Sequence, residues 1–339
     1  MVARLATFAV VIPALLSAQE EVPPLFASNE TLHFTLVADF NDIHKDRKQE
    51  SDYEPAELFF GPAAADVDGL ELKIKTRGRY RLKRSTCKYP PLRLNFPKKS
   101  VEGTVFEGQD KLKLVTHCQD RDSYEVNLVE EYLVYRIYNL LSDISFRVRL
   151  ARITYVDARG KDDPVVRYGF LIEDEDAMAA RLGGLLAEAP AVSPYDYDSE
   201  GAALVTVFQY MVGNTDFSLV HFHNIKLFRG AGFTHFPIPY DFDWSGLVDA
   251  RYAKPDPLFN TRSVRQRVFR GFCRPDVDFS AIFADIAERR AAIDELIANQ
   301  EGLDRRSRDR LTEYLDEFFE TIGKPREADR HIIGACRSI

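Results

Sequence analysis

The pattern of apolar and polar residues changes about halfway along the chain. In the first half, apolar residues alternate with polar ones over short stretches, as in half-buried strands. We expect strands at 32–38, 57–60, 70–77, 90–96, 111–115, 147–156 and 165–172. An apolar stripe at helical spacing predicts one long helix among them, from an N-cap at Ser123 to about Leu141. The stripe consists of Val126, Val129, Leu133, Ile137 and Leu140.

After Glu173 the pattern becomes mainly helical. We expect helices at 174–186, 199–212, 279–300, 305–322 and 327–335, interrupted by a β-hairpin at 225–240. The chain is therefore predicted to be an α+β protein with two lobes. A β-rich N-terminal lobe would cover 19–180 and a mainly helical C-terminal lobe 181–339. A cleft between unlike lobes is a common place to hold a ligand.

The N-terminus resembles a secretory signal peptide. Arg4 precedes an apolar run at 5–16, and the small residues Ser17 and Ala18 follow it. This order predicts a leader at 1–18, cleaved near Ala18. No later run approaches the ~18 apolar residues that a membrane-spanning helix needs. We therefore expect a soluble monomer that is periplasmic or secreted.

The chain has four cysteines, and three pairings of them are possible. An even number of cysteines in an exported protein favours disulfides over metal thiolates, and no C-x-x-C spacing is present. We favour Cys87–Cys118 and Cys273–Cys336, because each pair would link a segment within its own half of the chain. The second bridge would tie down the C-terminal tail.

Charge is distributed unevenly along this chain of 339 residues. The formal net charge is −8, and it becomes −9 when Arg4 leaves with the leader. The stretch 72–101 nevertheless lacks Asp and Glu and is rich in Lys and Arg. A basic patch on an acidic protein indicates a local anion site, rather than a surface for nucleic acid. A solvated strand face is the alternative for its first four charges.

The richest candidate chemistry surrounds the predicted hairpin. Asp216 and Asn224 precede it, and Asp241 and Asp243 follow it. A hairpin brings its two ends together, so these oxygen side chains are predicted to share one small volume. Protein kinases use the same order: a catalytic Asp, a metal-binding Asn, a hairpin and a metal-binding Asp. The spacing differs from the usual kinase motif, and there is no D-F-G sequence.

Four segments resemble the CotH-like atypical kinases, a family first known as spore-coat proteins. They are IKTRGRYRLKRSTCKYPPLRLNF at 74–96, DKLKLVTHCQDRDSYEVNLVEEYL at 110–133, VVRYGFLIEDED at 165–176, and GNTDFSLVHFHN with PIPYDFDWSG at 213–246. Together they cover about half of the mature chain. The resemblance implies a kinase-like fold that uses ATP with Mg²⁺ or Mn²⁺ to phosphorylate protein hydroxyls.

The resemblance also implies roles for single residues. Asp216 would be the catalytic Asp, and Asn224 with Asp241 or Asp243 would hold the metal. Lys88 or Arg93, together with Arg77, would meet the phosphates, and Glu130 would pair with that cation. This chain departs from the family pattern after the R-G pair, where Arg79-Tyr80-Arg81 replaces small polar residues.

Three other functions fit parts of the pattern. The chain could be a kinase-shaped module with a degenerate site, whose basic loop binds an anionic surface or protein partner. The D-x-D sequence at 241–243 is also used by haloacid-dehalogenase-like phosphatases, in which the first Asp is the nucleophile. His221 and His223 could serve a zinc hydrolase, although no third His has a suitable position.

Overall fold

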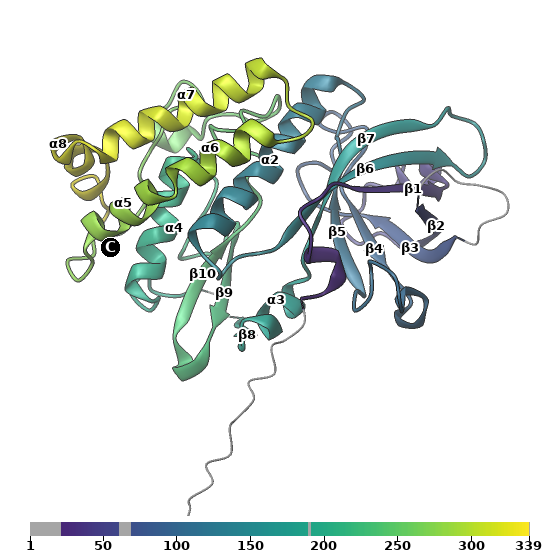
Figure 1. The fold of residues 1–339 in the computed structure, drawn as a ribbon, viewed down its shortest axis with the longest axis horizontal. Coiled ribbons are helices and arrows are strands. Elements are labelled where there is room, and N and C mark those ends of the chain that lie inside the picture. The colour runs from purple at the N-terminus through teal and green to yellow at the C-terminus, as the bar shows by residue number, and fades with distance from the viewer. Residues whose placement is uncertain (1–21, 61–68, 189–190, 339) are drawn as a thin grey trace, which may run out of the picture.

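The computed structural model describes residues 22–60, 69–188 and 191–338 and has a mixed α+β fold (Figure 1). The predicted leader at 1–18 lies outside the described residues. No helix in the described part of the chain is long and apolar enough to cross a membrane.

The strands are β1 (Leu32–Ala38), β2 (Glu54–Phe60), β3 (Leu70–Thr76), β4 (Leu92–Asn95), β5 (Lys111–Val115), β6 (Val148–Asp157), β7 (Val165–Ile172), β8 (Leu185–Leu186), β9 (Ile225–Arg229) and β10 (His235–Pro239). The α-helices are α1 (Phe40–Ile43), α2 (Asp122–Leu141), α3 (Glu175–Arg181), α4 (Ser199–Met211), α5 (Phe279–Glu288), α6 (Arg290–Asn299), α7 (Arg305–Ile322) and α8 (Pro325–Ala328).

The first seven strands close into a barrel in the order β1-β2-β3-β4-β5-β7-β6. Neighbouring strands are antiparallel except β1 and β6, which run parallel and close the barrel. Alternate side chains point inward and form an apolar core that includes Ile74, Leu94 and Leu112, all fully buried. The alternate residues between them, including Lys75, Arg93 and Lys113, therefore lie on the outer face of the sheet.

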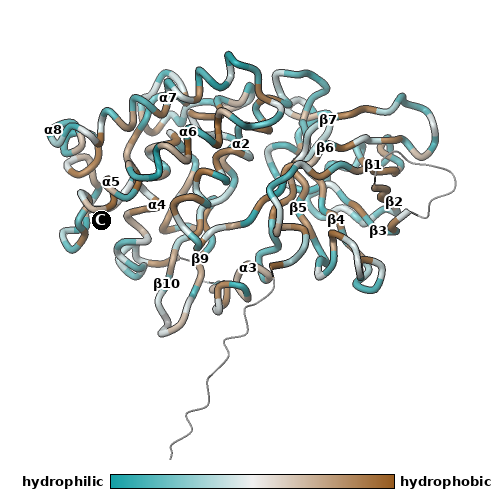
Figure 2. Tube along the Cα trace, in the orientation of Figure 1, coloured by the Kyte–Doolittle hydropathy of each residue, from teal (hydrophilic) through white to brown (hydrophobic). Residues whose placement is uncertain are grey.

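A second apolar core connects the barrel to the helices. Helix α2 packs against β6 and β7 on one side and against α6 on the other. Aromatic rings of α2 contact the barrel and a further helix: Tyr135 contacts Phe170 of β7, and Tyr138 contacts Phe208 of α4. Figure 2 shows hydrophobic residues along the barrel strands and α4, with hydrophilic residues over the outer turns of α7. Because α2 belongs to this shared core, its position is fixed relative to both halves of the chain.

The predicted hairpin is present as β9 and β10, and β8 pairs with the outer side of β9. The register places Ile225 opposite Pro239 at the open end. One residue further out, the Tyr240 amide donates to the Asn224 carbonyl at 3.1 Å. The turn passes through Gly232, whose φ of 72° lies in the left-handed region that glycine tolerates. The prediction that the hairpin brings its two ends together is therefore confirmed.

Both favoured disulfides are present. Cys87–Cys118 joins the β3–β4 loop to the segment after β5, with 4.5 Å between the Cα atoms. Cys273–Cys336 holds the C-terminal tail against the segment before α5, with a Cα separation of 4.9 Å. The first bridge matters for the site, because the β3–β4 loop carries much of the basic stretch.

Several predicted helix boundaries are wrong. Ser123 is not the N-cap of α2; the helix begins at Asp122, and acidic residues in its first turn complement the helix dipole. The helix expected at 174–186 ends at Arg181, because Gly183 takes a φ of 69° and the chain then pairs as β8.

The structure also divides two segments that were each predicted to be one helix. The helix expected at 279–300 is split at Arg289 into α5 and α6, with α6 turned to pack against α2. The segment expected at 327–335 is divided between α8 and a π-helical turn at Asp329–Ile333. No glycine or proline marks the split at Arg289 or the boundary between α8 and the π-helical turn.

Candidate functional site

Asp216 and Asn224 are joined directly in the loop between α4 and β9. The Asn224 amide nitrogen donates to the Asp216 carbonyl oxygen at 2.7 Å and to its carboxylate at 3.1 Å. Asn224 adopts a φ of 51°, a left-handed conformation that Asn tolerates better than most residues. Both contacts use the amide nitrogen, so neither engages the amide oxygen. His223 completes the group, with its Nε2 atom 2.8 Å from the Asp216 carboxylate.

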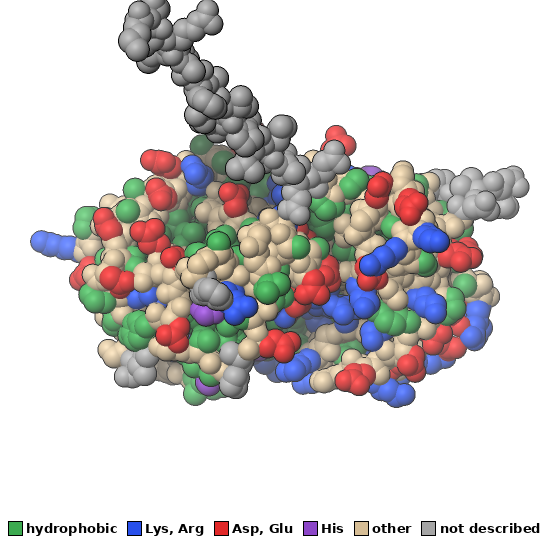
Figure 3. Space-filling view, turned by 90° about the horizontal axis from the view of Figure 1, so that it is seen from below, with side chains coloured by type: hydrophobic (Ala, Val, Ile, Leu, Met, Phe, Trp, Pro, Cys, Tyr) green, Lys and Arg blue, Asp and Glu red, His purple; other side chains and the backbone are tan. Residues whose placement is uncertain are grey.

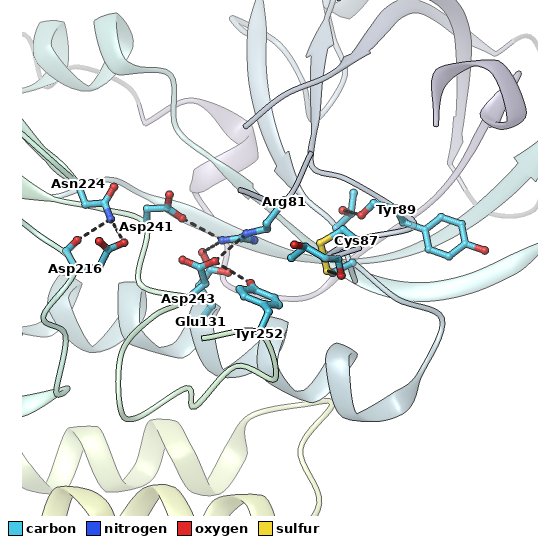
Figure 4. Close-up of polar contacts among 12 residues, drawn as sticks. Arg81, Cys87, Tyr89, Glu131, Asp216, Asn224, Asp241, Asp243 and Tyr252 are labelled. Carbon is cyan, nitrogen blue, oxygen red and sulfur yellow. Dashed lines mark hydrogen bonds and ion pairs between the residues drawn. A yellow bond between two sulfur atoms is a disulfide. The ribbon is translucent and has the colours of Figure 1, made fainter. Parts of the chain in front are cut away.

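Asp241 lies beside this pair because it directly follows the hairpin. Its backbone amide donates to the Tyr135 hydroxyl on α2 at 2.8 Å, and its φ is 61°. Figure 4 shows Asp216, Asn224 and Asp241 next to one another, at the side of the site away from Tyr252. The Asp241 side chain keeps 47% of its surface exposed, whereas that of Asp243 keeps 7%. Asp241 is therefore the accessible member of the Asp pair.

An arginine from the β3–β4 loop lies inside the acidic group. Arg81 Nη2 is 3.0 Å from both Glu131 on α2 and Asp241, and its Nε is 3.0 Å from Asp243. The Tyr252 hydroxyl also donates to Asp243, at 2.8 Å. Glu131, Asp241 and Asp243 each offer an oxygen within 4.8 Å of the others. One guanidinium thus contacts three carboxylates (Figure 4).

The charges of this acidic group are not balanced. Burial raises the pKa of Asp243 well above its usual range, with repulsion from Asp241 adding to the shift and Arg81 opposing it. Burial likewise raises the pKa of Glu131. Although burial opposes the charge of Arg81, the carboxylates of Asp243 and Glu131 raise its pKa as well. The group has more carboxylates than its single cation can neutralise.

Three cations stand opposite one another on the outer face of the barrel. In the strand register Lys75 of β3 pairs with Arg93 of β4, which pairs with Lys113 of β5. Like charges directly opposite in a sheet destabilise it. We call Lys75, Arg93 and Lys113 the cation ladder. Figure 3 shows Lys and Arg side chains gathered near the middle of the face seen there. A ladder of this kind favours a bound anion.

Arg77 links the ladder to the acidic group. It follows β3 immediately, and burial lowers its pKa, with the charges of Arg81 and Arg93 adding to the effect and Asp241 opposing it. The charge of Arg77 therefore interacts with the cation ladder and with the acidic group. The cations and the carboxylates form one continuous electrostatic site.

Lys113 is the most deeply placed cation of the ladder. It contacts Glu175 at the start of α3 and is 8% exposed. Burial lowers the pKa of Lys113 to about 8. Although burial opposes ionisation of Glu175, its contacts with Lys113 and Lys226 lower the pKa of that carboxyl to about 2. Both members of the pair are therefore charged at neutral pH.

The structure brings most of the predicted site residues together. Asp216, Asn224, Asp241 and Asp243 surround the open end of the hairpin, while Arg77 and Arg93 belong to the cation face beside it. The structure gives only the positions of these residues. The catalytic, metal-binding and phosphate-binding roles of the residues remain predictions.

The predicted pairing of Glu130 is wrong, and Lys88 lies apart from the acidic group. Glu130 does not pair with a cation of the basic loop: it contacts Arg310 on α7, and burial raises its pKa to about 7. Adjacent residues on a helix point about 100° apart, so its neighbour Glu131 faces the site instead. The Lys88 ammonium lies 4.9 Å from the centre of the Tyr89 ring and lines a separate cavity.

Arg81, Glu131 and Lys113 belong to the site but were not among the residues predicted for it. In the sequence, Arg81 is one of the basic residues at 72–101 and part of the departure from the family pattern. Glu131 adjoins the apolar stripe of α2 as closely as Glu130 does, so the pattern alone does not separate them. The sequence does contain a pattern that could have identified Lys113. In the short strand K-L-K-L-V, this lysine alternates with buried leucines.

The contact between His223 and Asp216 should be visible in solution. The hydrogen bond to Asp216 raises the pKa of His223 above 6.5. The charged pair therefore stabilises the fold fully below about pH 6.5, and this contribution is lost as pH rises through the folded-state value. An NMR titration should give His223 a midpoint above 6.5, and Asp216→Asn should lower it. An unchanged midpoint in that variant would contradict the contact.

The chain was compared with protein families, curated sequences and solved structures. No family model matches the chain, and no curated protein sequence matches it. Among solved structures, the crystal structure of a Helicobacter pylori proinflammatory kinase CtkA matches with 12% sequence identity and a TM-score of 0.36. The match covers 86% of this chain and 92% of that one. A superposition this loose carries no argument, so the function must be inferred from the site.

Proposed function

We propose that this protein is a phosphotransferase, which moves the γ-phosphoryl group of ATP to a hydroxyl of an exported protein with the help of Mg²⁺ or Mn²⁺. The observation that carries the proposal is the convergence of Asp216, Asn224 and Asp241 at the open end of the hairpin, beside a face of cations. Phosphoryl transfer needs this combination: a carboxylate for the nucleophile, oxygen ligands for a cation, and positive charge for phosphates.

Asp216 is suited to receive the proton of the attacking hydroxyl. Its side chain is about one third exposed, and Asn224 and His223 hold its carboxylate in place. In the proposed step the hydroxyl oxygen forms a bond to the γ-phosphorus, and the bond to the β–γ bridging oxygen breaks. ADP leaves with that electron pair, and the hydroxyl proton passes to Asp216.

The donor atoms near Asp216 fit a hard divalent cation. The Asn224 amide oxygen and the accessible Asp241 carboxylate are the ligand types that Mg²⁺ and Mn²⁺ prefer. A bound cation would offset the negative charge of the triphosphate. Asp243 is less suited to the role, because its carboxylate is buried and held by Arg81 and Tyr252.

The cation ladder is suited to the phosphates. Lys113 and Arg93 are directly opposite each other, and the charges of both Arg93 and Asp241 act on Arg77. The mutual repulsion of these cations would fall when a polyanion binds. We propose Lys113, rather than Lys88, as the lysine that meets the nucleotide.

A kinase-shaped module without activity is the second candidate, and Arg81 supports it. Its guanidinium contacts Asp241, the carboxylate that is proposed to bind metal. A side-chain cation at this place can substitute for a divalent ion and hold the acidic group together without one. In that case, the cation ladder would bind an anionic partner.

Nucleotide binding separates the two candidates. We expect Mg²⁺ or Mn²⁺ to increase the rise in melting temperature that ATP and ADP cause, because ligands stabilise the state that binds them. Asp241→Asn should abolish the metal-dependent part of the shift and leave the fold intact. Differential scanning fluorimetry with nucleotide, metal, both and neither measures this directly.

The matched control is Asp285→Asn, which makes the same change at an exposed position of α5. This variant should behave as the unsubstituted protein does. A metal-dependent nucleotide shift that survives in Asp241→Asn, or the lack of any metal-dependent shift in the unsubstituted protein, would contradict the phosphotransferase proposal.

A further inference from the structure

A second site candidate lies at the opposite end of the β3–β4 loop. The cavity has a volume of about 300 Å³. Its walls come from α1 and the turn after it, from the β3–β4 loop, from the segment after β5, and from the β6–β7 turn. Figure 4 shows Tyr89, one of its lining residues, on the far side of Cys87 from Arg81. The cavity is therefore distinct from the site around Asp216.

Five aromatic side chains that line the cavity contact one another in a closed circuit. The centres of neighbouring rings are 4.5–5.5 Å apart. The circuit runs from Phe40 to His44, Tyr89, His117, Tyr155 and back to Phe40. Aromatic faces of this kind bind planar rings by stacking and edge contacts. The circuit therefore favours a flat, aromatic ligand.

Polar groups in the same walls lack partners. Both ring nitrogens of His117, the Tyr155 hydroxyl and one carboxylate oxygen of Asp157 are buried and have no hydrogen-bond partner among the described residues. Burial lowers the pKa of His117 to about 3, so its neutral ring offers one donor and one acceptor. Buried polar groups without partners are costly, and several around one cavity indicate a polar occupant.

Charge is divided between the two sides of the cavity. The α1 side and the β3–β4 loop contribute Lys45, Arg47, Arg84 and Lys88, whereas the β6–β7 side contributes Asp157, Asp162 and Asp163. Arg47 and Arg84 donate to main-chain carbonyls, which carry no full charge and leave the guanidinium charges available. A matching ligand has N–H donors at one end and an anionic group at the other.

The walls are fixed to one another around this space. Arg47 donates to the Cys87 and Lys88 carbonyls at 3.1 and 2.9 Å, which joins the segment after α1 to the β3–β4 loop. The Asn41 amide donates to Asp162 at 2.9 Å and joins α1 to the β6–β7 turn. The Cys87–Cys118 disulfide joins the β3–β4 loop to the wall formed by the segment after β5. The cavity is therefore preformed, as small-molecule sites usually are.

We propose that this cavity binds a small heteroaromatic anion of the mononucleotide class. The base lies among the five aromatic rings with its N–H donors toward Asp157, and the phosphate lies against Lys88 and Arg84. The cavity volume suits one base with a single phosphate better than a nucleoside triphosphate. This inference does not rest on the proposed phosphotransfer, and the two sites differ in their need for a divalent cation.

Isothermal titration calorimetry of the full chain with AMP and with UMP, in EDTA, tests the proposal. At least one of the two should bind at one site per chain without metal. The matching nucleoside, which lacks phosphate, and ribose 5-phosphate, which lacks the base, should each bind at least tenfold more weakly. Failure of both AMP and UMP to bind would overturn the proposal.

Two pairs of variants locate the binding. Val165→Phe fills the cavity and should weaken binding at least tenfold, whereas Val166→Phe changes the adjacent, 44% exposed residue on the other face of β7 and should not. Lys88→Gln should weaken nucleotide binding at least tenfold but leave nucleoside binding unchanged, and Lys98→Gln is its exposed control. Lys88 is exposed, so this variant tests the proposal even if Val165→Phe does not fold.

The outcomes also separate this site from the site around Asp216. Binding that requires Mg²⁺ and disappears in Asp241→Asn belongs to the other site and would overturn the assignment to the cavity. Binding in EDTA that survives in Asp241→Asn and is lost in Lys88→Gln supports it, whatever the fate of the proposed phosphotransfer.

Discussion

Phosphoryl transfer should fall by about 10²–10⁴-fold when Asp216 is replaced by Asn, because the attacking hydroxyl loses its proton acceptor. The substitution keeps the shape of the side chain and leaves an amide oxygen that can still accept from Asn224. Metal-dependent nucleotide binding should therefore change little. The measurement is the rate of phosphate transfer from labelled ATP to protein hydroxyls, alongside the melting shift caused by ATP and Mg²⁺.

The pair of readouts makes this prediction specific. Asp216→Asn should lose transfer and keep binding, whereas Asp241→Asn should lose both. Asp285→Asn, the exposed control on α5, should lose neither. Full transfer activity in Asp216→Asn would show that another group accepts the proton and would remove Asp216 from the catalytic role.

Replacing Arg81 with Gln should lower the free energy of unfolding by about 3–5 kcal/mol at pH 8, the usual cost of breaking a buried ion pair from one side. The change leaves Glu131, Asp241 and Asp243 next to one another without their shared cation. Urea unfolding at pH 5 and at pH 8 measures the effect.

The pH dependence has a definite sign. Burial already raises the pKa of Glu131 and Asp243 in the folded protein, and loss of the guanidinium raises it further. The unfolded values are about 4, so the folded state binds more protons than the unfolded state above that pH. Stability of the variant should therefore fall as pH rises, and the deficit should be smaller at pH 5 than at pH 8.

Arg79→Gln provides the control for this prediction, because it removes the same charge at an exposed position of the same loop. Its unfolding free energy should stay within about 0.5 kcal/mol of that of the unsubstituted protein. Equal stability of Arg81→Gln and Arg79→Gln at pH 8 would mean that Arg81 does not neutralise the acidic group.

Much of the fold was predictable because it depends on local pattern. Alternation of apolar residues gave β1, β5 and β7 with the bounds that the structure has. The hairpin followed from two apolar runs around a glycine-containing turn, and the approach of Asn224 to Asp241 followed from the hairpin. The cysteine pairing followed from the separation along the chain.

The barrel closure and the helix breaks were not predictable in the same way. The parallel pairing of β1 with β6 joins residues more than a hundred positions apart, and nothing near either strand specifies the partner. Arg289 divides two helices without glycine or proline, because α6 turns to pack against α2. Packing between distant segments overrides local propensity at such places.

The sequence by itself determined the order Asp216, Asn224, Asp241 and the hairpin that joins them, because short-range turn geometry is enough to bring these groups together. Only the tertiary structure decided which charges face them. The β3–β4 loop has no repeating pattern of apolar and polar residues that would predict its course. The folded path of the loop places Arg81 at the acidic group and Lys88 at the aromatic cavity. The choice of Glu131 over Glu130 depends on the rotation of α2, which is set by packing on both of its sides.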